Sequence, residues 1–238
     1  MRADQFVANT LNISRSKANE LIKNQQIKID DKFISKSSDE IKNLQSKISC
    51  ESEIFVSRGA IKLKGFLQEL RTKFELNLSD KTALDIGSST GGFVQILLQN
   101  GVKSITALDI GNNQLSDILR NDDRVIVREN TDIRDFKSTP FDIITADVSF
   151  ISLRHILPCI DRLAKNDIIL LFKPQFEAGI DAKRDKNGVL KDQKALNLAK
   201  NEFEQICLNL GWRLKFSSLC VIKGKSGNQE RFYYYDKK

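Results

Sequence analysis

The first stretch of the chain shows the apolar spacing of two short helices. Residues 4–12 and 15–24 repeat apolar positions at intervals of three or four residues. Residues 26–35 then alternate apolar and polar positions around a polar aspartate pair, the pattern of two short strands joined by a turn. These patterns predict a compact α-α-β unit that extends to about residue 52.

From residue 81 onward, apolar strands alternate with segments of helical spacing. The predicted elements are, in chain order, strand 81–87, helix 91–101, strand 104–111, helix 113–121, strand 124–130, strand 141–150, helix 152–166, strand 167–173, helix 191–210 and strands 213–222 and 231–236. Apolar strands separated by helices predict a mostly parallel sheet that helices cover on both faces. The expected fold class is therefore α/β, with a sheet of seven strands.

The segment between these two regions lacks a strong period. Residues 45–56 are polar and then apolar, which is typical of connecting chain. A chain of 238 residues can form one large and one small domain, since domains usually contain roughly 100 to 200 residues. We therefore predict a first domain over 1–52, a linker over 53–56 and a second domain over 57–238.

The charge of the chain favours a polyanionic partner. Lys and Arg total 38 against 31 Asp and Glu, and the resulting net charge of +7 attracts nucleic acid over long distances. An ordinary solvated basic surface is the alternative.

Several other classes of protein are disfavoured. The four cysteines contain no C-x-x-C pair, so they indicate reduced core thiols rather than a zinc site or a disulfide framework. A single histidine argues against a His-rich metal centre, and we predict no metal. The N-terminus is polar and no apolar run approaches the roughly 18 residues that a membrane span needs. We therefore expect a cytoplasmic protein that does not bind membranes.

A glycine-rich turn follows the first strand of the α/β region. Glycines permit a tight turn and the close approach of a ligand, at the carboxyl edge of the sheet. The spacing differs from the G-x-G-x-x-G fingerprint, which points away from a dinucleotide. The residues predicted to bind a cofactor here are Asp85, Gly87, Ser88, Ser89, Thr90, Gly91, Gly92 and Phe93.

Two further aspartates follow later strands. Asp109 ends the second strand roughly 20 residues after the turn, where a carboxylate can accept both hydroxyls of an adenosine ribose. Asp132 follows the third strand and is placed to meet the adenine, although a solvated aspartate or a helix cap is the alternative. Asp85, the Gly87 turn and Asp109 together resemble the first two cofactor motifs of class I (Rossmann-like) methyltransferases. The resemblance implies S-adenosyl-L-methionine as cofactor and S-adenosyl-L-homocysteine as product.

Four short signatures resemble one family closely. They are SRGAIKL at 57–63, ADVSF at 146–150, FKPQFE at 172–177 and GNQE at 227–230. They are similar to the signatures of the TlyA (hemolysin A) ribosomal RNA methyltransferases, relatives of the FtsJ 2′-O-methyltransferases. With the first domain included, the resemblance covers nearly the whole chain.

The first domain resembles the S4 RNA-binding domain. Its R-x-D pattern falls on Arg2 and Asp4, and its S-R-S-x-A pattern on 14–18. The S4 family usually carries Gly after the second helix and Asn-Gly in the turn, where this chain has Gln25 and an aspartate pair. The resemblance implies a small α+β RNA-binding domain whose basic side chains hold phosphates. Those side chains are Arg2, Arg15, Lys17, Lys23, Lys28 and Lys32, with a solvated helix surface or a docking module as alternatives.

The family's K-D-K-E tetrad falls on Lys62, Asp147, Lys173 and Glu230. Asp147 and Lys173 follow parallel strands, at the edge of the glycine turn, and the strand pattern supports them independently. A lysine can help a hydroxyl lose its proton when burial and cations lower its pKa from about 10.4, and carboxylates can hold it in place. We expect Lys173 to lie closest to a ribose 2′-hydroxyl, with Asp147 and Glu230 orienting it and Lys62 adding positive charge. The alternatives are a strand-end cap for Asp147, a solvated helix residue for Lys62 and a surface ion pair for Glu230.

The resemblance also implies the substrate, a cytidine ribose in ribosomal RNA. The chain looks like the shorter of two forms of the family, because the S4-like pattern starts at Arg2 and the chain stops six residues after Phe232, so we expect the large subunit as target. Phe150 and Phe176 are predicted to stack on an extruded base, and Arg58 to contact RNA. Three alternatives stay open: a catalytically idle RNA-binding or assembly factor, a membrane-active hemolysin and a small-molecule methyltransferase.

Overall fold

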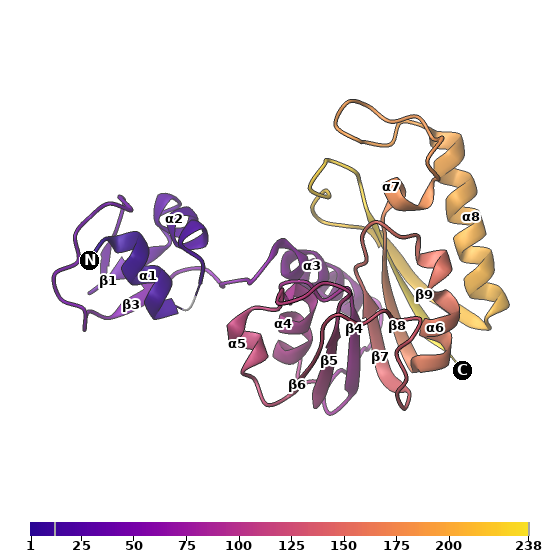
Figure 1. Cartoon of the computed structure of the whole chain (residues 1–238), viewed down its shortest axis with the longest axis horizontal. Helices are drawn as coiled ribbons and strands as arrows, with labels where there is room; N and C mark the ends of the chain where they lie inside the picture. The colour runs from indigo at the N-terminus through magenta and orange to yellow at the C-terminus, as the bar shows by residue number, and fades with distance from the viewer. Residues whose placement is uncertain (12, 238) are drawn as a thin grey trace. The chain divides into compact units, whose positions relative to one another are not determined.

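The computed structural model describes residues 1–11 and 13–237 (Figure 1). The chain divides into two compact units, Met1–Val56 and Ser57–Lys238. The second unit begins at the residue where the second domain was expected, and the predicted linker 53–56 groups with the first unit.

The first unit contains two helices and a small antiparallel sheet of order β2-β1-β3. Its elements are α1 (Ala3–Leu11), α2 (Arg15–Lys23), β1 (Ile27–Ile29), β2 (Lys32–Phe33) and β3 (Ile48–Cys50). Residue 12, the last of the predicted first helix, lies outside the described residues. The expectation of connecting chain over 45–56 is wrong at β3, which pairs with β1. The three residues of β3 are all half-buried, so no alternation marks them in the sequence.

Among the described residues of this unit, three that are not glycine adopt left-handed backbone conformations. Gln25 has φ +53° after α2, while Asp30 and Asp31 have φ +48° and +63° in the two-residue turn between β1 and β2. Positive φ at both central residues is the requirement of a type I′ hairpin turn. The backbone therefore takes the conformations that glycine and asparagine would favour, with residues that tolerate them less well.

The second unit is built on a seven-stranded sheet of order β6-β5-β4-β7-β8-β10-β9, as the pattern predicted. Strands β6, β5, β4, β7 and β8 are parallel, whereas β10 is antiparallel to both β8 and β9. The strands are β4 (Thr82–Ile86), β5 (Ser104–Leu108), β6 (Val125–Arg128), β7 (Phe141–Ala146), β8 (Ala164–Phe172), β9 (Trp212–Leu219) and β10 (Arg231–Lys237).

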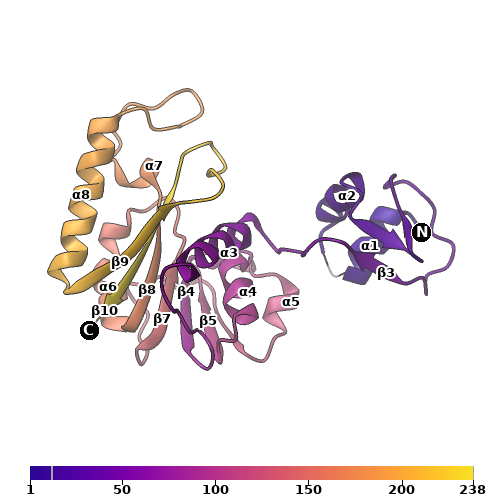
Figure 2. The same cartoon turned by 180° about the vertical axis from the view of Figure 1, so that it is seen from behind.

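Helices cover both faces of this sheet (Figures 1 and 2). Alternating side chains of β10 show the two faces: the Phe232 ring stacks on Phe66 of α3, and the Tyr233 ring packs edge-on against Phe203 of α8. The helices are α3 (Arg58–Arg71), α4 (Gly92–Gln99), α5 (Asp117–Arg120), the 3₁₀ turn η1 (Leu153–His155), α6 (Leu157–Leu163), α7 (Pro174–Glu177) and α8 (Gln193–Asn209).

Two predicted helices are shorter than expected. The helix expected over 113–121 is reduced to α5, because Glu129 accepts the backbone N–H groups of Asn113, Gln114 and Leu115 and holds them outside a helix. The helix expected over 152–166 ends at Leu163, because β8 begins at Ala164, which pairs with β7.

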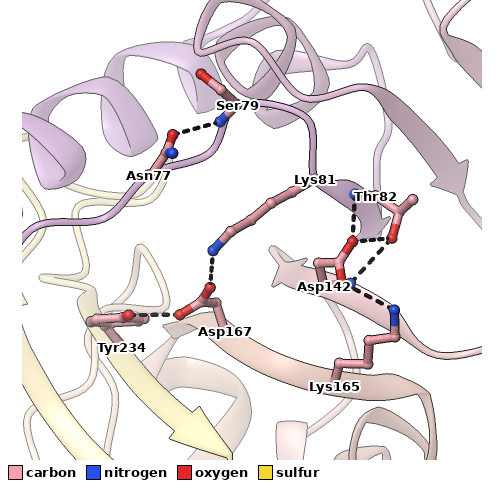
Figure 3. Close-up of polar contacts among 8 residues, drawn as sticks. All are labelled: Asn77, Ser79, Lys81, Thr82, Asp142, Lys165, Asp167 and Tyr234. Carbon is pink, nitrogen blue, oxygen red and sulfur yellow. Dashed lines mark hydrogen bonds and ion pairs between the residues drawn. The ribbon is translucent and has the colours of Figure 1, made fainter.

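Polar contacts fix the strands at the amino-terminal edge of the sheet (Figure 3). The amide and hydroxyl of Thr82, at the start of β4, donate to Asp142 of β7 at 2.9 and 2.7 Å. These hydrogen bonds, the backbone one first, lower the pKa of Asp142 to about 2. Asp167 of β8 accepts a hydrogen bond from the Tyr234 hydroxyl of β10 at 2.7 Å and pairs with Lys81 at 2.5 Å. Because these contacts fix the register of the strands, the carboxyl ends of β4, β7 and β8 lie together at the opposite edge of the sheet.

Candidate active site

The predicted tetrad comes together at the carboxyl edge of the parallel strands. Asp147 directly follows β7, and Lys173 directly follows β8. Glu230 precedes β10, and because β10 runs antiparallel, its beginning lies beside the end of β8. Lys62 reaches the same place from α3. Four residues spread over most of the second unit therefore share one site.

The tetrad consists of two close ion pairs. Lys173 Nζ lies 2.6 Å from Asp147 Oδ1, and Lys62 Nζ lies 2.7 Å from Glu230 Oε2. A longer contact of 3.9 Å from Lys62 Nζ to Asp147 Oδ2 links the pairs. Lys62, Lys173 and Glu230 are buried, so Lys62 is no solvated helix residue. Glu230 contacts Lys62, and the expectation that it orients Lys173 is corrected accordingly.

Sequence reasoning did not assign a role to Ser149, which also binds Lys173. The Lys173 ammonium donates to Ser149 Oγ at 2.8 Å as well as contacting Asp147. Ser149 lies in the ADVSF signature, two residues after Asp147. This position in the sequence could have identified it as a residue of the site. An ammonium has three N–H donors, and with one donated to Ser149 Oγ, Lys173 can also donate to a further acceptor.

The glycine turn lies against this site. Gly87 has φ +77°, and a Cβ there would lie 3.0 Å from the Asp147 carbonyl oxygen. Gly91 also has positive φ, at +94°. Backbone conformation therefore favours glycine at both positions, and Gly87 is also required by its closeness to the end of β7, whereas a Cβ on Gly91 would lie 2.2 Å from the Leu119 side chain.

Two residues predicted to bind the cofactor have clear packing roles. A Cβ on Gly92 would lie 2.3 Å from Ser57 Oγ and 2.6 Å from the Ala60 amide nitrogen, so this glycine lets α4 approach α3. The Phe93 ring stacks on Phe232 with centroids 5.9 Å apart and is buried. Gly92 and Phe93 nonetheless line the pocket beside the tetrad, together with the predicted Ser88, Ser89 and Thr90.

Asp85 and Asp109, on either side of the turn in the sequence, are both held by hydrogen bonds. Asp85 is buried and accepts a hydrogen bond from Thr145 Oγ1 at 2.6 Å. Burial raises the pKa of Asp85 to about 7, with smaller upward contributions from Asp147 and Asp109 that the Thr145 hydrogen bond opposes. The two carboxylate oxygens of Asp109 accept the Ser89 and Gly111 amides, each at 2.7 Å. Asp109 therefore joins the turn to the loop after β5.

Two pockets adjoin at this edge. One of about 520 Å³ is lined by Gly87, Asp109, Asp132, Arg134 and Phe150, among others. The second, of about 540 Å³, is lined by three tetrad members and the glycine turn. Both include Gly87, Ser89, Asp147 and Ser149 in their walls, so they are continuous. Asp132 forms an ion pair with Arg134 at 2.5 Å in the wall of the first pocket.

The predicted base-stacking residues lie together, and Phe150 lines the first pocket. Phe150 is 93% exposed and has φ +66°, an unusual conformation for an aromatic residue. Its ring centroid is 5.4 Å from that of Phe176, which follows Lys173 on α7. Next on α7, the buried Glu177 accepts hydrogen bonds from Ser152 Oγ at 2.5 Å and the Leu153 amide at 2.8 Å, which ties the Phe150 loop to α7.

The basic residues predicted to contact RNA differ in their partners. Arg15 and Arg2 pair with Asp4 at 2.8 and 3.1 Å, and these contacts, the Arg2 hydrogen bond first, hold the Asp4 pKa well below its usual range. Lys17 pairs with Glu20 and Lys28 with Glu51, whereas Lys23 and Lys32 are exposed. In the second unit, Arg58 donates to the Lys223 carbonyl at 2.7 Å.

No helix in the described part of the chain is long and apolar enough to cross a membrane. Within residues 1–11 and 13–237, no group of three or more His, Cys, Asp or Glu side chains is arranged to hold a metal ion. The four cysteines are free.

Comparison with known proteins identifies related sequences over the whole chain. Residues 55–237 match the family of FtsJ-like methyltransferases. A 23S rRNA (cytidine-2′-O)-methyltransferase TlyA from Campylobacter jejuni is 51% identical, with all of both chains covered. A 16S/23S rRNA (cytidine-2′-O)-methyltransferase TlyA from Mycobacterium tuberculosis is 34% identical, with 97% of this chain and 87% of the relative covered. A crystal structure of a protein named as a hemolysin, from Lactococcus lactis, has a TM-score of 0.71 at 38% identity, covering 77% of this chain and 89% of that chain.

Proposed function

The chain belongs to the FtsJ-like methyltransferases of the TlyA type, and from this premise we propose that it methylates the 2′-hydroxyl of a cytidine in ribosomal RNA with S-adenosylmethionine. The observation that carries the proposal is the pair of linked ion pairs beside the glycine turn. A substrate of this kind agrees with the net charge of +7 and with the expected cytoplasmic location.

The pockets fit the proposed cofactor. S-adenosylmethionine carries a cationic sulfonium and an ammonium, and the continuous pockets are lined by Asp85, Asp109, Asp132 and Asp147. Gly87 leaves the turn without a side chain where the two pockets join. Asp109 would hold the ribose, Asp132 would face the adenine and the turn would hold the methionine part. The bound cofactor supplies a methyl group that the sulfonium makes electrophilic.

The tetrad would act on the acceptor hydroxyl. Lys173 would direct an N–H donor to the 2′-oxygen, while Asp147 and Ser149 fix the direction of the ammonium. This contact would stabilise the negative charge that develops on the oxygen, and the hydroxyl proton would pass to solvent. Lys62, held by Glu230, adds a second positive charge next to Asp147. Correct alignment then provides much of the rate, because the methyl donor is already reactive.

The remaining predicted residues would bind RNA. Phe150 and Phe176 would stack on a base turned out of its helix, since the exposed Phe150 ring lies beside the half-buried Phe176 ring. The first unit would hold phosphates as an S4-like domain, in which Lys23 and Lys32 are exposed. For the large subunit as target, support comes from the relative named for 23S rRNA alone, which is 51% identical against 34% for the relative named for both RNAs.

The proposal is tested with separated ribosomal subunits and methyl-labelled S-adenosylmethionine, followed by mass spectrometry of the nucleosides. We expect 2′-O-methylcytidine from large-subunit RNA with the wild-type protein, and product formation reduced by at least about a hundredfold in Lys173→Ala. Lys165→Ala is the matched control, because Lys165 lies on β8, the strand that Lys173 follows, but pairs with Asp142 at the opposite edge.

Three results would contradict the proposal. Methylation of a base instead of a ribose would remove the chemistry assigned to the tetrad. Equal 2′-O-methylcytidine in small-subunit RNA would refute the choice of subunit. Full single-turnover activity in Lys173→Ala would show that another group handles the hydroxyl.

A further inference from the structure

The four side chains of the tetrad carry no net positive charge that could attract a phosphate. Lys62 and Lys173 are each matched by a carboxylate within 2.7 Å, so the two cations and two anions cancel. The aspartates that line the pockets add negative charge. An RNA strand that enters this site therefore needs a cation at the rim to offset the repulsion of its own phosphates.

Lys225 is placed to provide that cation. Its side chain is exposed and lines the pocket that contains Lys62, Asp147 and Lys173. Among the residues that the structure describes, Lys225 has no ion-pair partner, in contrast to both lysines of the tetrad. A free ammonium at the entrance of a neutral site can bind an anionic group of the substrate.

The loop that carries Lys225 is a fixed turn. The Gly227 amide donates to the Gly224 carbonyl at 2.9 Å, so Lys225 and Ser226 are the central residues of a β-turn. Gly224 lies close to the tetrad, because a Cβ there would be 2.6 Å from Glu230 Oε1. The position of Lys225 is thereby coupled to that of Glu230.

Hydrogen bonds with two other segments anchor this turn. The buried Asn228 side chain accepts the Leu190 amide at 2.9 Å and donates to the Gly188 carbonyl at 3.1 Å. The yellow segment between β9 and β10 accordingly rises beside the orange segment before α8 (Figures 1 and 2). On the other side, Arg58 holds the Lys223 carbonyl. Anchoring reduces the entropy that Lys225 would lose on binding a ligand.

We propose that Lys225 binds a backbone phosphate next to the nucleotide to be methylated and thereby positions the acceptor strand over the tetrad. This role rests on the proposed function, since it assumes an RNA substrate. Lys225 is a substrate-binding residue for a polynucleotide, and a free nucleoside would not use it. Arg58 is then a residue that shapes the loop rather than a direct RNA contact.

The test measures the affinity of the full-length protein for large-subunit RNA over a series of salt concentrations. The variants are Lys225→Gln, Lys225→Arg and the control Lys223→Gln, which removes an equally exposed lysine outside the pocket wall. Loss of one phosphate contact should weaken binding about fivefold and reduce the slope of log affinity against log salt by about 0.7 to 0.9. We expect this in Lys225→Gln, near wild-type values in the other two variants, and unchanged S-adenosylmethionine affinity by calorimetry in all three.

The outcomes that would contradict the role of Lys225 differ from those that would contradict the proposed function. An unchanged salt slope in Lys225→Gln, or an equal change in Lys223→Gln, would overturn the assignment. Weakened S-adenosylmethionine binding in Lys225→Gln with unchanged RNA binding would assign the lysine to the cofactor instead. Absence of 2′-O-methylcytidine with the wild-type protein would refute the proposed function, while the RNA-binding measurements would still decide the role of Lys225.

Discussion

Replacing Asp85 with asparagine is expected to remove a pH dependence from the free energy of unfolding. Asp85 is 1% exposed, and burial raises its pKa from 3.8 to about 7. The folded protein therefore binds this proton more tightly than the unfolded chain. The contribution of Asp85 to stability is fully present below pH 3.8 and is lost as the pH rises through about 7. Asparagine stays neutral and can still accept the Thr145 hydrogen bond through its amide oxygen.

The size of the effect follows from the two pKa values. With 3.8 for the unfolded chain and about 7 for the folded protein, linkage gives a loss of roughly 3 kcal/mol between about pH 5 and about pH 8. Wild-type protein should lose this amount relative to Asp85→Asn over that interval. Asp142→Asn is the control, because the Asp142 pKa is lowered to about 2 and its carboxylate is charged in both states throughout this range.

Urea unfolding at the two pH values measures these differences. The single tryptophan, Trp212, is buried at the start of β9, so its fluorescence reports on the second unit alone. If the difference in unfolding free energy between wild type and Asp85→Asn is the same at both pH values, Asp85 does not titrate in this range and the reasoning from its burial is refuted.

Three further predictions concern the backbone and the cofactor. Gln25→Gly should stabilise the first unit by about 1 kcal/mol, because glycine adopts the observed φ of +53° without strain, and slower amide hydrogen exchange in α2 and β1 would show it. Gly92→Ala should destabilise the second unit by about 1 to 3 kcal/mol in Trp212 fluorescence, since the methyl group meets the Ala60 backbone; wild-type stability would contradict this. Asp109→Ala should weaken S-adenosylmethionine binding at least about tenfold in calorimetry while the protein stays folded, and unchanged affinity would remove Asp109 from the site.

The parallel strands could be predicted from the sequence because their residues are apolar on both faces. In β7 and β8, nearly every position is buried, so apolar runs mark the strands without alternation. By contrast, β3 has only half-buried residues and leaves no such signal. The shortening of the helix over 113–121 also could not be predicted from the sequence, because it depends on Glu129, a residue outside the segment. Local pattern fails where a distant side chain decides the backbone.

The same limit applies to the candidate site. The strand pattern alone places Asp147 and Lys173 at one edge, because carboxyl ends of neighbouring parallel strands must meet. The partner of Glu230 could not be predicted, since 168 positions separate it from Lys62 and only the antiparallel course of β10 joins them. Resemblance supplied the four residues, and geometry corrected which carboxylate holds which lysine.

The position of β10 between β8 and β9 also has a consequence for how the protein is made. Synthesis proceeds from the N-terminus, yet β9, which is made before β10, borders only β10 in the sheet. A nascent chain that has emerged as far as Leu219 therefore holds a strand with no neighbour to join. Pairing of β10 with β8 creates that neighbour and brings Glu230 to Lys62 in the same step. The tetrad is therefore incomplete until β10 has joined the sheet.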